Sequence, residues 1–140
     1  MPPEPPLRVE LDQTLDATLG IETLSLSAES ATGRIPVEDR IRQPLGLVHG
    51  GAIAAIAESL CSAATFMAVS AEGQVAQGLS NQTSFMRPIL EGHVNAAARR
   101  MHRGRTTWVW EVEITDDDER LCALSRVTMA VRPASDRSGS

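Results

Sequence analysis

A single carboxylate, Glu58, interrupts an otherwise uncharged and largely apolar segment that runs from Gly51 to Val69. Placing a carboxylate in apolar surroundings costs free energy unless the group is paired or hydrogen-bonded. We therefore expect Glu58 to be buried and to be an acid, a base or a nucleophile in a reaction. Ser62 lies four residues further on, so its hydroxyl shares a helix face with Glu58 and can orient the carboxylate.

A glycine pair, Gly50 and Gly51, stands where this apolar segment is expected to begin a helix. Glycine lets another group approach the backbone closely. The first N–H groups of a helix have no partner within the helix, and they favour negative charge. An amide donor together with one carboxylate suits acyl transfer, because the donor stabilises an oxyanion while the carboxylate attacks or activates water.

The rest of the sequence predicts the elements that position these residues. Asp12 and Gly20 bound a short predicted helix as its two caps. Strands are predicted at 21–28, 31–37, 75–86, 93–102, 106–115 and 121–131, with the long helix after the second of them. Trp108 and Trp110 fall on one face of the strand at 106–115, together with Val112 and Ile114, and are expected in the core or an interface. Consecutive strands joined by short turns pair antiparallel, so the pattern predicts an α+β fold with a six-stranded antiparallel sheet curled around one helix.

Composition narrows the class of protein further. The 140 residues, 42% of them hydrophobic, predict one domain over 1–140 with flexible tails at 1–10 and 134–140. A net charge of −5 argues against a nucleic-acid partner. Cys61 and Cys122 are expected to be buried, reduced thiols. The proline-rich start does not fit a signal peptide, and the apolar segment contains Glu58 and hydroxyl residues, so we expect a cytoplasmic protein whose long helix is buried rather than membrane-spanning.

Several short motifs resemble the hotdog-fold acyl-CoA thioesterases, and among them the 4-hydroxybenzoyl-CoA thioesterases that carry a glutamate on the central helix. The motifs are QTLD at 13–16, LGLVHGGA at 45–52, SFMRP at 84–88, EGHV at 91–94, TTW at 106–108 and LCA at 121–123. The resemblance implies the hotdog fold and hydrolysis of 4-hydroxybenzoyl-CoA to 4-hydroxybenzoate and CoA, as in aromatic degradation. It also implies a homodimer that pairs again into a homotetramer.

The resemblance also implies roles for individual residues. Glu58 matches the catalytic carboxylate, and Gly50 matches the residue whose N–H polarises the thioester carbonyl. Gln43 matches a polar side chain near the thioester, and Ser62 a hydroxyl one turn beyond the acid. Positions near the nucleotide of coenzyme A are matched by Arg87 and Thr106, while Arg105 stands where the family is expected to carry a small polar residue.

Some assignments stay open from the residues alone. His49 is either structural or a substrate contact, and Glu58 either attacks the thioester directly or activates water. No cofactor is expected beyond the CoA of the substrate. No metal site is expected either, because His93 and His102 have no cysteine or acidic partner at ligand spacing.

The spacing along the helix has a consequence for assembly. Gly50 precedes Glu58 by eight residues, or about 12 Å of helix at ~1.5 Å per residue. This is too far for both groups to hold one thioester, so we expect each site to be shared by two subunits.

Three other functions compete with this one. An enoyl-CoA hydratase would need an Asp and His pair near the helix start, which is missing, and a non-catalytic acyl-CoA-binding module would not need Glu58. A phenylacetyl-CoA or broad-specificity thioesterase is the alternative within the same chemistry.

Overall fold

The structure, a computed structural model, describes residues 7–134, so residues 1–6 and 135–140 of the predicted tails lie outside it. Its longer elements are β1 (Glu22–Leu26), β2 (Ser30–Pro36), α2 (Gly50–Val69), β3 (Gln74–Phe85), β4 (His93–Arg103), β5 (Thr107–Thr115) and β6 (Leu121–Pro133). A short helix, α1 (Leu15–Leu19), and three 3₁₀ turns at Leu11–Gln13, Asp39–Ile41 and Ser70–Glu72 complete the set.

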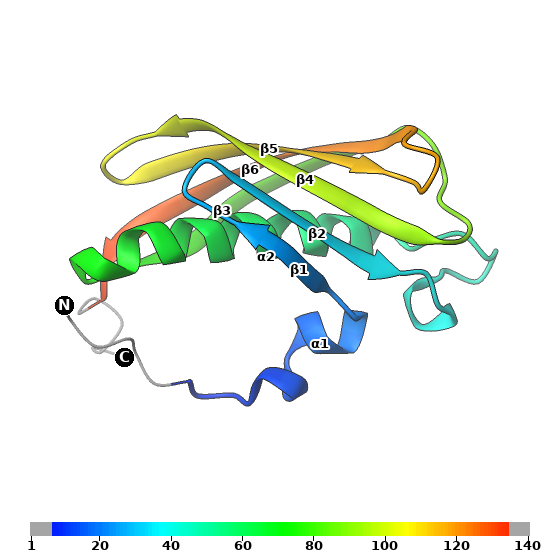
Figure 1. The fold of residues 1–140 in the computed structure, drawn as a ribbon, viewed down its shortest axis with the longest axis horizontal. Helices are drawn as coiled ribbons and strands as arrows, with labels where there is room; N and C mark the ends of the chain where they lie inside the picture. Colours follow the sequence, from blue (N-terminus) through cyan, green and yellow to red (C-terminus); the bar gives the residue numbers. More distant parts are fainter. Residues whose placement is uncertain (1–6, 135–140) are drawn as a thin grey trace.

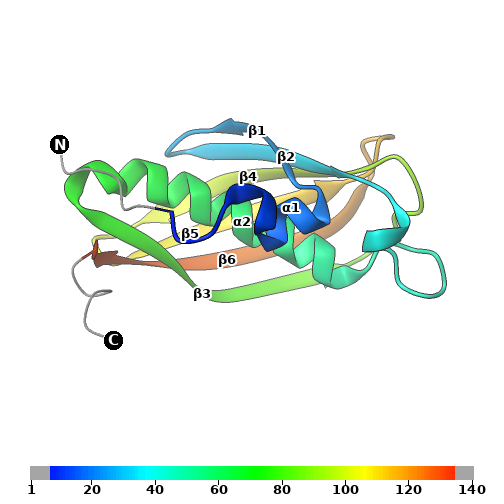
Figure 2. The same cartoon turned by 90° about the horizontal axis from the view of Figure 1, so that it is seen from below.

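One six-stranded sheet wraps one side of the long helix α2 (Figures 1 and 2). Its strand order is β1-β2-β4-β5-β6-β3, and every neighbouring pair is antiparallel. The predicted α+β architecture is therefore confirmed. Strands β1 and β3 form the two edges of the sheet, and β3 runs beside α2 for most of the length of the helix.

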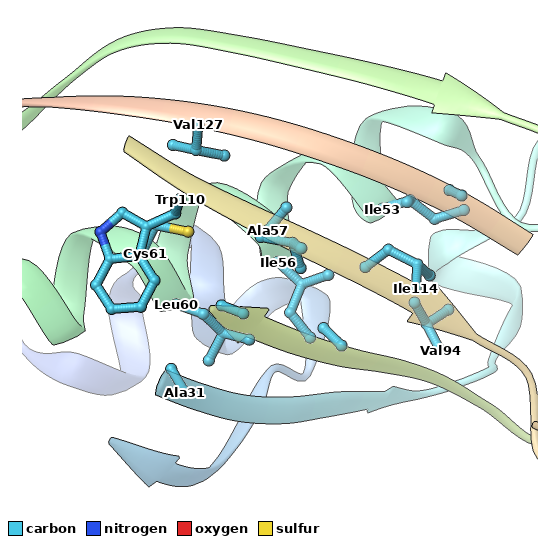
Figure 3. Close-up of a cluster of buried hydrophobic side chains, with 14 of the residues drawn as sticks. Ala31, Ile53, Ile56, Ala57, Leu60, Cys61, Val94, Trp110, Ile114 and Val127 are labelled. Carbon is cyan, nitrogen blue, oxygen red and sulfur yellow. The ribbon is translucent and has the colours of Figure 1, made fainter. Parts of the chain in front are cut away.

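The core lies between α2 and the inner face of the sheet (Figure 3). Trp108 and Trp110 are 1% and 0% exposed, which confirms the prediction from their alternation on β5. The indole Nε1 of Trp110 donates to Thr65 Oγ1 at 2.9 Å, and that hydroxyl donates to the Cys61 carbonyl at 2.7 Å. The helix therefore places a hydroxyl where the buried indole N–H needs an acceptor.

The N-terminal helix differs from the prediction. Thr14, not Asp12, caps α1, because Thr14 Oγ1 accepts from Ala17 N at 3.3 Å while Asp12 lies in the preceding 3₁₀ turn. Gly20 ends the helix with φ of 78°, as predicted. Leu11 and Leu15, four residues apart, are 69% and 65% exposed, so this helical segment buries neither of them.

Helix α2 with its following turn, Gly50–Glu72, is long and apolar enough to cross a membrane by length and composition. In the fold its inner face is covered by the sheet, with Ile56, Ala57, Cys61 and Ala64 fully buried. It is thus the central helix of an α+β core, and its apolar composition is explained by packing.

Edge strand β3 contains an irregularity that decides which of its residues face the helix. The pairing with β6 shifts between Gly78 and Ser80, which leaves Leu79 as the extra residue of a β-bulge. Before the bulge, Gly78 is paired with the buried Met129; after it, Asn81 is paired with the buried Val127. The inward positions therefore change from even to odd numbers, and Asn81, Thr83 and Phe85 follow on the helix side.

Candidate active site

The start of α2 presents one uncapped amide. His49 is the N-cap residue, and its Nδ1 accepts from Gly51 N at 2.8 Å, while Ala52 N donates to the His49 carbonyl at 3.0 Å. Within residues 7–134 the N–H of Gly50 has no hydrogen-bond partner. A Cβ on Gly51 would lie 2.9 Å from His49 Nδ1, so glycine there lets the imidazole fold back. His49 thus has a structural role, and Gly50 offers a free donor.

Gln43 lies in the loop that leads into α2. Its side-chain Oε1 accepts from the backbone N–H of Leu45, and its own N–H donates to the Leu47 carbonyl at 2.8 Å. His49 N in turn donates to the Ile41 carbonyl at 2.7 Å, which holds the loop against the helix start. Because Oε1 is engaged within the loop, the side-chain NH₂ of Gln43 is the group left to contact a ligand.

Glu58 is exposed in the single chain, and the expectation that it is buried is wrong for an isolated subunit. The physical reason is the helix face. The buried residues of α2 include Ile53, Ile56 and Leu60, whereas Glu58 lies on the opposite side with the half-buried Ser62. Apart from Glu58, Ser59 and Ser62, the outer face carries mainly alanines, Phe66 and Met67, so composition alone did not reveal an outer face.

Glu58 and Ser62 line one cavity of about 360 Å³ on this outer face. Asp16 of α1 also borders the cavity, and its Oδ1 accepts from Ser59 Oγ at 2.7 Å. The remaining lining residues are Ala63, Phe66, Val75 and Ala76. The cavity therefore combines two carboxylates and two serine hydroxyls with one aromatic ring and small apolar side chains. Asp16 belongs to the QTLD motif, but its place beside Glu58 was not predicted.

Asn81 of β3 is a second neighbour of Glu58 that was not predicted from the sequence. Its Nδ2 donates to the Ala54 carbonyl at 2.9 Å and lies 3.5 Å from Glu58 Oε1. On the other side of the carboxylate, a Cβ on Gly78 would lie 3.3 Å from Glu58 Oε2. The carboxylate therefore rests on edge strand β3, between a glycine and an amide donor.

Cys61, close to Glu58 on the helix, is not a candidate nucleophile. Burial, and secondly the negative charge of Glu58, raise the pKa of its thiol to about 12. A thiol with that pKa is protonated at neutral pH, and the thiolate is the reactive form. Both Cys61 and Cys122 are free and buried, as predicted.

The three predicted nucleotide-binding positions are not brought together in one subunit. Arg87 N donates to the Cys122 carbonyl at 3.0 Å, near the start of β6, whereas Thr106 accepts from Val131 N at 2.9 Å, near its end. The intervening stretch of β6 spans about 30 Å at ~3.3 Å per residue. Arg105 lies next to Thr106 in the β4–β5 turn, and both are exposed.

The turn between β4 and β5 carries a basic surface. Arg132 Nη1 donates to the Thr106 carbonyl at 3.1 Å, close to Arg105. Arg100 and Arg103 stack over Trp108, with their Cζ atoms 5.1 and 4.7 Å from the ring centroid. Arg103 is exposed, whereas Arg100 is half-buried and its Nη1 donates to the Ala28 carbonyl at 2.8 Å, so of these two side chains Arg103 is the one that contributes to the basic surface.

The two remaining histidines lie apart from Glu58. His93 Nδ1 is 3.0 Å from Asp117 Oδ2, and Asn95 Nδ2 donates to Asp117 Oδ1 at 3.0 Å. The hydrogen bond from Asn95, and secondly the contact with His93, hold the pKa of the Asp117 carboxyl below its usual value. No group of three or more His, Cys, Asp or Glu side chains that could hold a metal ion occurs within residues 7–134.

The site thus consists of two groups of residues, one at the start of α2 and one further along it. Gln43, His49 and the free Gly50 amide lie at the helix start, and Glu58 with Ser62 lies two turns further on, about 12 Å away by the helical rise of ~1.5 Å per residue. An amide that can stabilise an oxyanion and a carboxylate that can supply or activate an attacking oxygen are both present. In one subunit they are too far apart to act on the same carbonyl.

Comparison with known proteins agrees with this chemistry. The sequence profile of the thioesterase superfamily matches residues 45–123. PA1618 from Pseudomonas aeruginosa is 40% identical over 121 residues, which cover 86% of this chain and 83% of that protein. The proofreading thioesterase EntH from Cronobacter turicensis is 38% identical over 118 residues, covering 84% and 85%.

Solved structures give the same result. The crystal structure of a mutant of thioesterase PA1618 has a TM-score of 0.83 at 38% identity and covers 87% of this chain and 88% of its own. A mutant of the Staphylococcus aureus protein SAV0944 has a TM-score of 0.82 at 30% identity and covers 86% and 99%. The chain therefore belongs to the thioesterase superfamily, has the hotdog fold and is an acyl-CoA thioesterase.

Proposed function

We propose that the protein hydrolyses an aryl-CoA thioester, 4-hydroxybenzoyl-CoA, to 4-hydroxybenzoate and CoA in the cytoplasm. The observation that carries this proposal is the cavity of about 360 Å³ beside Glu58, whose wall combines Phe66 with Asp16, Ser59 and Ser62. An aromatic ring can pack on Phe66 and the small apolar side chains, and a phenol O–H needs an acceptor such as the Asp16 carboxylate. An alkyl chain offers no O–H to the second oxygen of the Asp16 carboxylate, so it would gain less from this wall than a phenol.

In the proposed reaction the Gly50 N–H donates to the thioester carbonyl oxygen. Because the N–H lies at the N-terminus of α2, the helix dipole adds to the stabilisation of the negative charge that develops there. The NH₂ group of Gln43 and the exposed ring edge of His49 line the same end of the helix and contact the thioester and the adjoining part of the substrate. Ser62 orients the Glu58 carboxylate from one turn away.

Glu58 supplies the attack in one of two ways. Direct attack on the carbonyl carbon forms a mixed anhydride and expels the CoA thiolate, after which water cleaves the anhydride. Alternatively, Glu58 removes a proton from water as the water attacks, and the thiolate leaves from the tetrahedral intermediate. The resemblance favours direct attack. A single turnover in ¹⁸O-water tests the direct route. Attack by water on the Glu58 carbonyl carbon of the anhydride leaves label in Glu58, which the general-base route never does.

Solved structures of relatives support the assignment of Gln43 and Glu58. Two mutants of SAV0944 have been crystallised. In one, alanine replaces a glutamine; in the other, alanine replaces a glutamate that lies 15 residues further along that chain. Gln43 and Glu58 are separated by the same 15 residues. A glutamine is also replaced in the solved PA1618 mutant. The residues chosen for replacement in these relatives thus match the residue types and spacing proposed here.

The proposed enzyme is a homodimer that pairs again into a tetramer. Edge strand β3 offers unpaired backbone groups along Gln74–Phe85, and Leu79, Phe85 and Met86 on or next to it are 56%, 55% and 54% exposed. Such an edge can pair with the same strand of a second copy. In the dimer, Glu58 of one subunit faces the Gly50 amide of the other, which resolves their separation within one chain.

The same assembly accounts for the separated nucleotide-binding positions. Arg87 lies at one end of the sheet, and Arg105, Thr106 and Arg132 lie at the other. In the proposed site, coenzyme A lies between subunits, so that Arg87 from one chain and the β4–β5 turn from another approach the nucleotide. Guanidinium groups suit its phosphates because they donate two parallel hydrogen bonds.

The test is the rate of CoA thiol release from benzoyl-, 4-hydroxybenzoyl-, phenylacetyl- and straight-chain acyl-CoA, each measured with wild type and Glu58→Ala. We expect the highest kcat/KM with 4-hydroxybenzoyl-CoA, and a loss of kcat on the order of 10³-fold in Glu58→Ala with little change in KM. A preference for phenylacetyl-CoA or for alkyl chains would contradict the aryl specificity. Wild-type kcat in the Glu58→Ala variant would contradict the role of Glu58.

A further inference from the structure

Three polar side chains form a hydrogen-bonded chain that ends at Glu58, and they lie on the inner face of the sheet, where apolar residues are the rule. Thr83 Oγ1 donates to Asn81 Oδ1 at 2.8 Å, and Thr83 Oγ1 is 2.8 Å from Ser125 Oγ. Ser125 is 1% exposed, and Asn81 and Thr83 are half-buried. Polar groups kept at such positions cost free energy unless their mutual hydrogen bonds are complete.

The direction of the chain follows from its donors. Thr83 has one hydroxyl proton, which it gives to Asn81 Oδ1, so the proton between Thr83 and Ser125 must come from Ser125. With its Oδ1 held by Thr83, the Asn81 amide must turn its NH₂ the other way. There it donates to the Ala54 carbonyl at 2.9 Å and points a second proton toward Glu58 Oε1 at 3.5 Å.

The long final contact is consistent with a catalytic carboxylate in the absence of substrate. Hydrogen bonds to reacting groups are often long in the free enzyme and shorten in the complex. Gly78 leaves room for the second oxygen, since a Cβ at that position would lie 3.3 Å from Oε2. Asn81 is therefore the β3 side chain that limits the position of the carboxylate, through its contact with Oε1.

We infer that Asn81 is a positioning residue for Glu58, and that Thr83 and Ser125 act through it by fixing the orientation of its amide. The inference rests on the proposed function, because it assumes that Glu58 attacks or activates water. A carboxylate held in one orientation loses less conformational freedom when it reacts, and a misplacement of about 1 Å can cost on the order of 10²-fold in rate.

The experiment compares Asn81→Ala, Thr83→Val and the double variant in steady-state kinetics on the acyl-CoA that wild type hydrolyses fastest. We expect Asn81→Ala to lower kcat by about 10-fold, the size of one hydrogen bond to a charged group, with KM within about 2-fold. Thr83→Val should lower kcat less, and the double variant should lose no more than Asn81→Ala alone. That non-additivity is the mark of residues acting in series, which a general loss of packing would not produce.

Gln82→Ala is the matched control. Gln82 lies between these residues on β3, points to the other face of the sheet and is exposed, so its replacement should leave kcat unchanged. Asn81→Asp provides a second variant of nearly the same shape that can no longer donate and that places a negative charge beside Glu58; its kcat should fall at least as far as that of Asn81→Ala. Thermal unfolding of each variant checks that it is folded.

The outcomes separate this inference from the proposed function. If Glu58→Ala is inactive while Asn81→Ala keeps wild-type kcat, Asn81 does not position Glu58 and the inference is wrong, although the proposed function stands. Losses of Asn81→Ala and Thr83→Val that multiply in the double variant would equally contradict the series arrangement. If Glu58→Ala itself retains wild-type kcat, the proposed function has failed instead.

Discussion

The tip of the Phe85 ring occupies the space where a side chain on Gly50 would begin: a Cβ built on Gly50 would be 2.9 Å from Phe85 Cζ. The contact joins the end of edge strand β3 to the start of α2. It explains why the free amide of the site is carried by a glycine, since any larger residue would displace the ring or the amide.

Gly50→Ala should therefore lower kcat/KM by about 10-fold, because a shift of the amide donor misplaces the oxyanion contact. Phe85 is 55% exposed, so a smaller side chain there can make room. The double variant Gly50→Ala/Phe85→Leu should recover part of the loss. Steady-state kinetics of the two single variants and the double variant test this; wild-type kcat/KM in the Gly50→Ala enzyme would show that the close contact is irrelevant.

The basic β4–β5 turn should govern affinity for coenzyme A. Arg105→Ala is expected to raise KM several-fold with kcat nearly unchanged, because an exposed contact between a guanidinium and a phosphate binds ground state and transition state alike. Repeating the measurement with the thioester of dephospho-CoA shows which phosphate is involved. A variant that lowers kcat at constant KM would place Arg105 in another role.

Both thiols should resist modification in the folded protein. Burial, with a smaller contribution from the charge of Glu58, raises the pKa of Cys61 to about 12, and burial also raises the pKa of Cys122. At pH 8 a disulfide reagent such as DTNB should react with neither cysteine in the native protein. It should react with both cysteines once the protein is unfolded in urea. Rapid native-state reaction of one thiol would contradict the buried positions.

The hairpin turn after β5 should contribute stability that depends on pH. Asp116 accepts hydrogen bonds from Arg120 N, Asp118 N and the Arg120 guanidinium, and the first of these is the largest cause that lowers its pKa from 3.8. A carboxyl with a lowered folded-state pKa stabilises the fold above its unfolded value and loses that contribution as the pH falls through the folded value.

Asp116→Asn should therefore unfold at lower urea concentration than wild type from pH 5 to 8, and the difference should shrink below the ordinary carboxyl pKa of 3.8. Asp118→Asn is the control, because the Asp118 side chain is 80% exposed and its contact with Arg120 Nη2 is long, at 3.4 Å. Equal effects of the two substitutions at all pH values would show that the Asp116 network adds nothing.

The order of elements was predictable from the sequence because its patterns are local. Trp108 and Trp110 alternate with partly exposed residues on β5, and the long apolar run matches α2. The position of Glu58 was harder to predict. An apolar run suggests burial on every side, but among residues 7–134 the outer face of α2 is bordered only in part, by α1 and edge strand β3, so that Glu58 stays exposed. Only the sheet topology shows which side of the helix that is.

Asn81 was not predictable for a different physical reason. The bulge at Leu79 interrupts the alternation of inward and outward residues along β3. Gly78 and Asn81 therefore share a face although they are three residues apart. The hydrogen bonds of Asn81 also depend on Ser125, 44 residues away in the sequence and next to Thr83 only through the β3–β6 pairing. The available signal was that Asn81 and Thr83 are both polar and lie two residues apart on one face of β3. Recognising that this face points inward needs the register of the sheet.

The central claim is that Glu58 of one subunit and the Gly50 amide of another form each active site. The direct measurement mixes Glu58→Ala subunits with Gly50→Pro subunits, each inactive alone, and follows CoA thiol release while native mass spectrometry counts the hybrids. A hybrid dimer holds one site with both groups intact, so it should regain about half the activity of a wild-type dimer. If hybrids form and no activity returns, the two groups act within one chain and the shared site is contradicted.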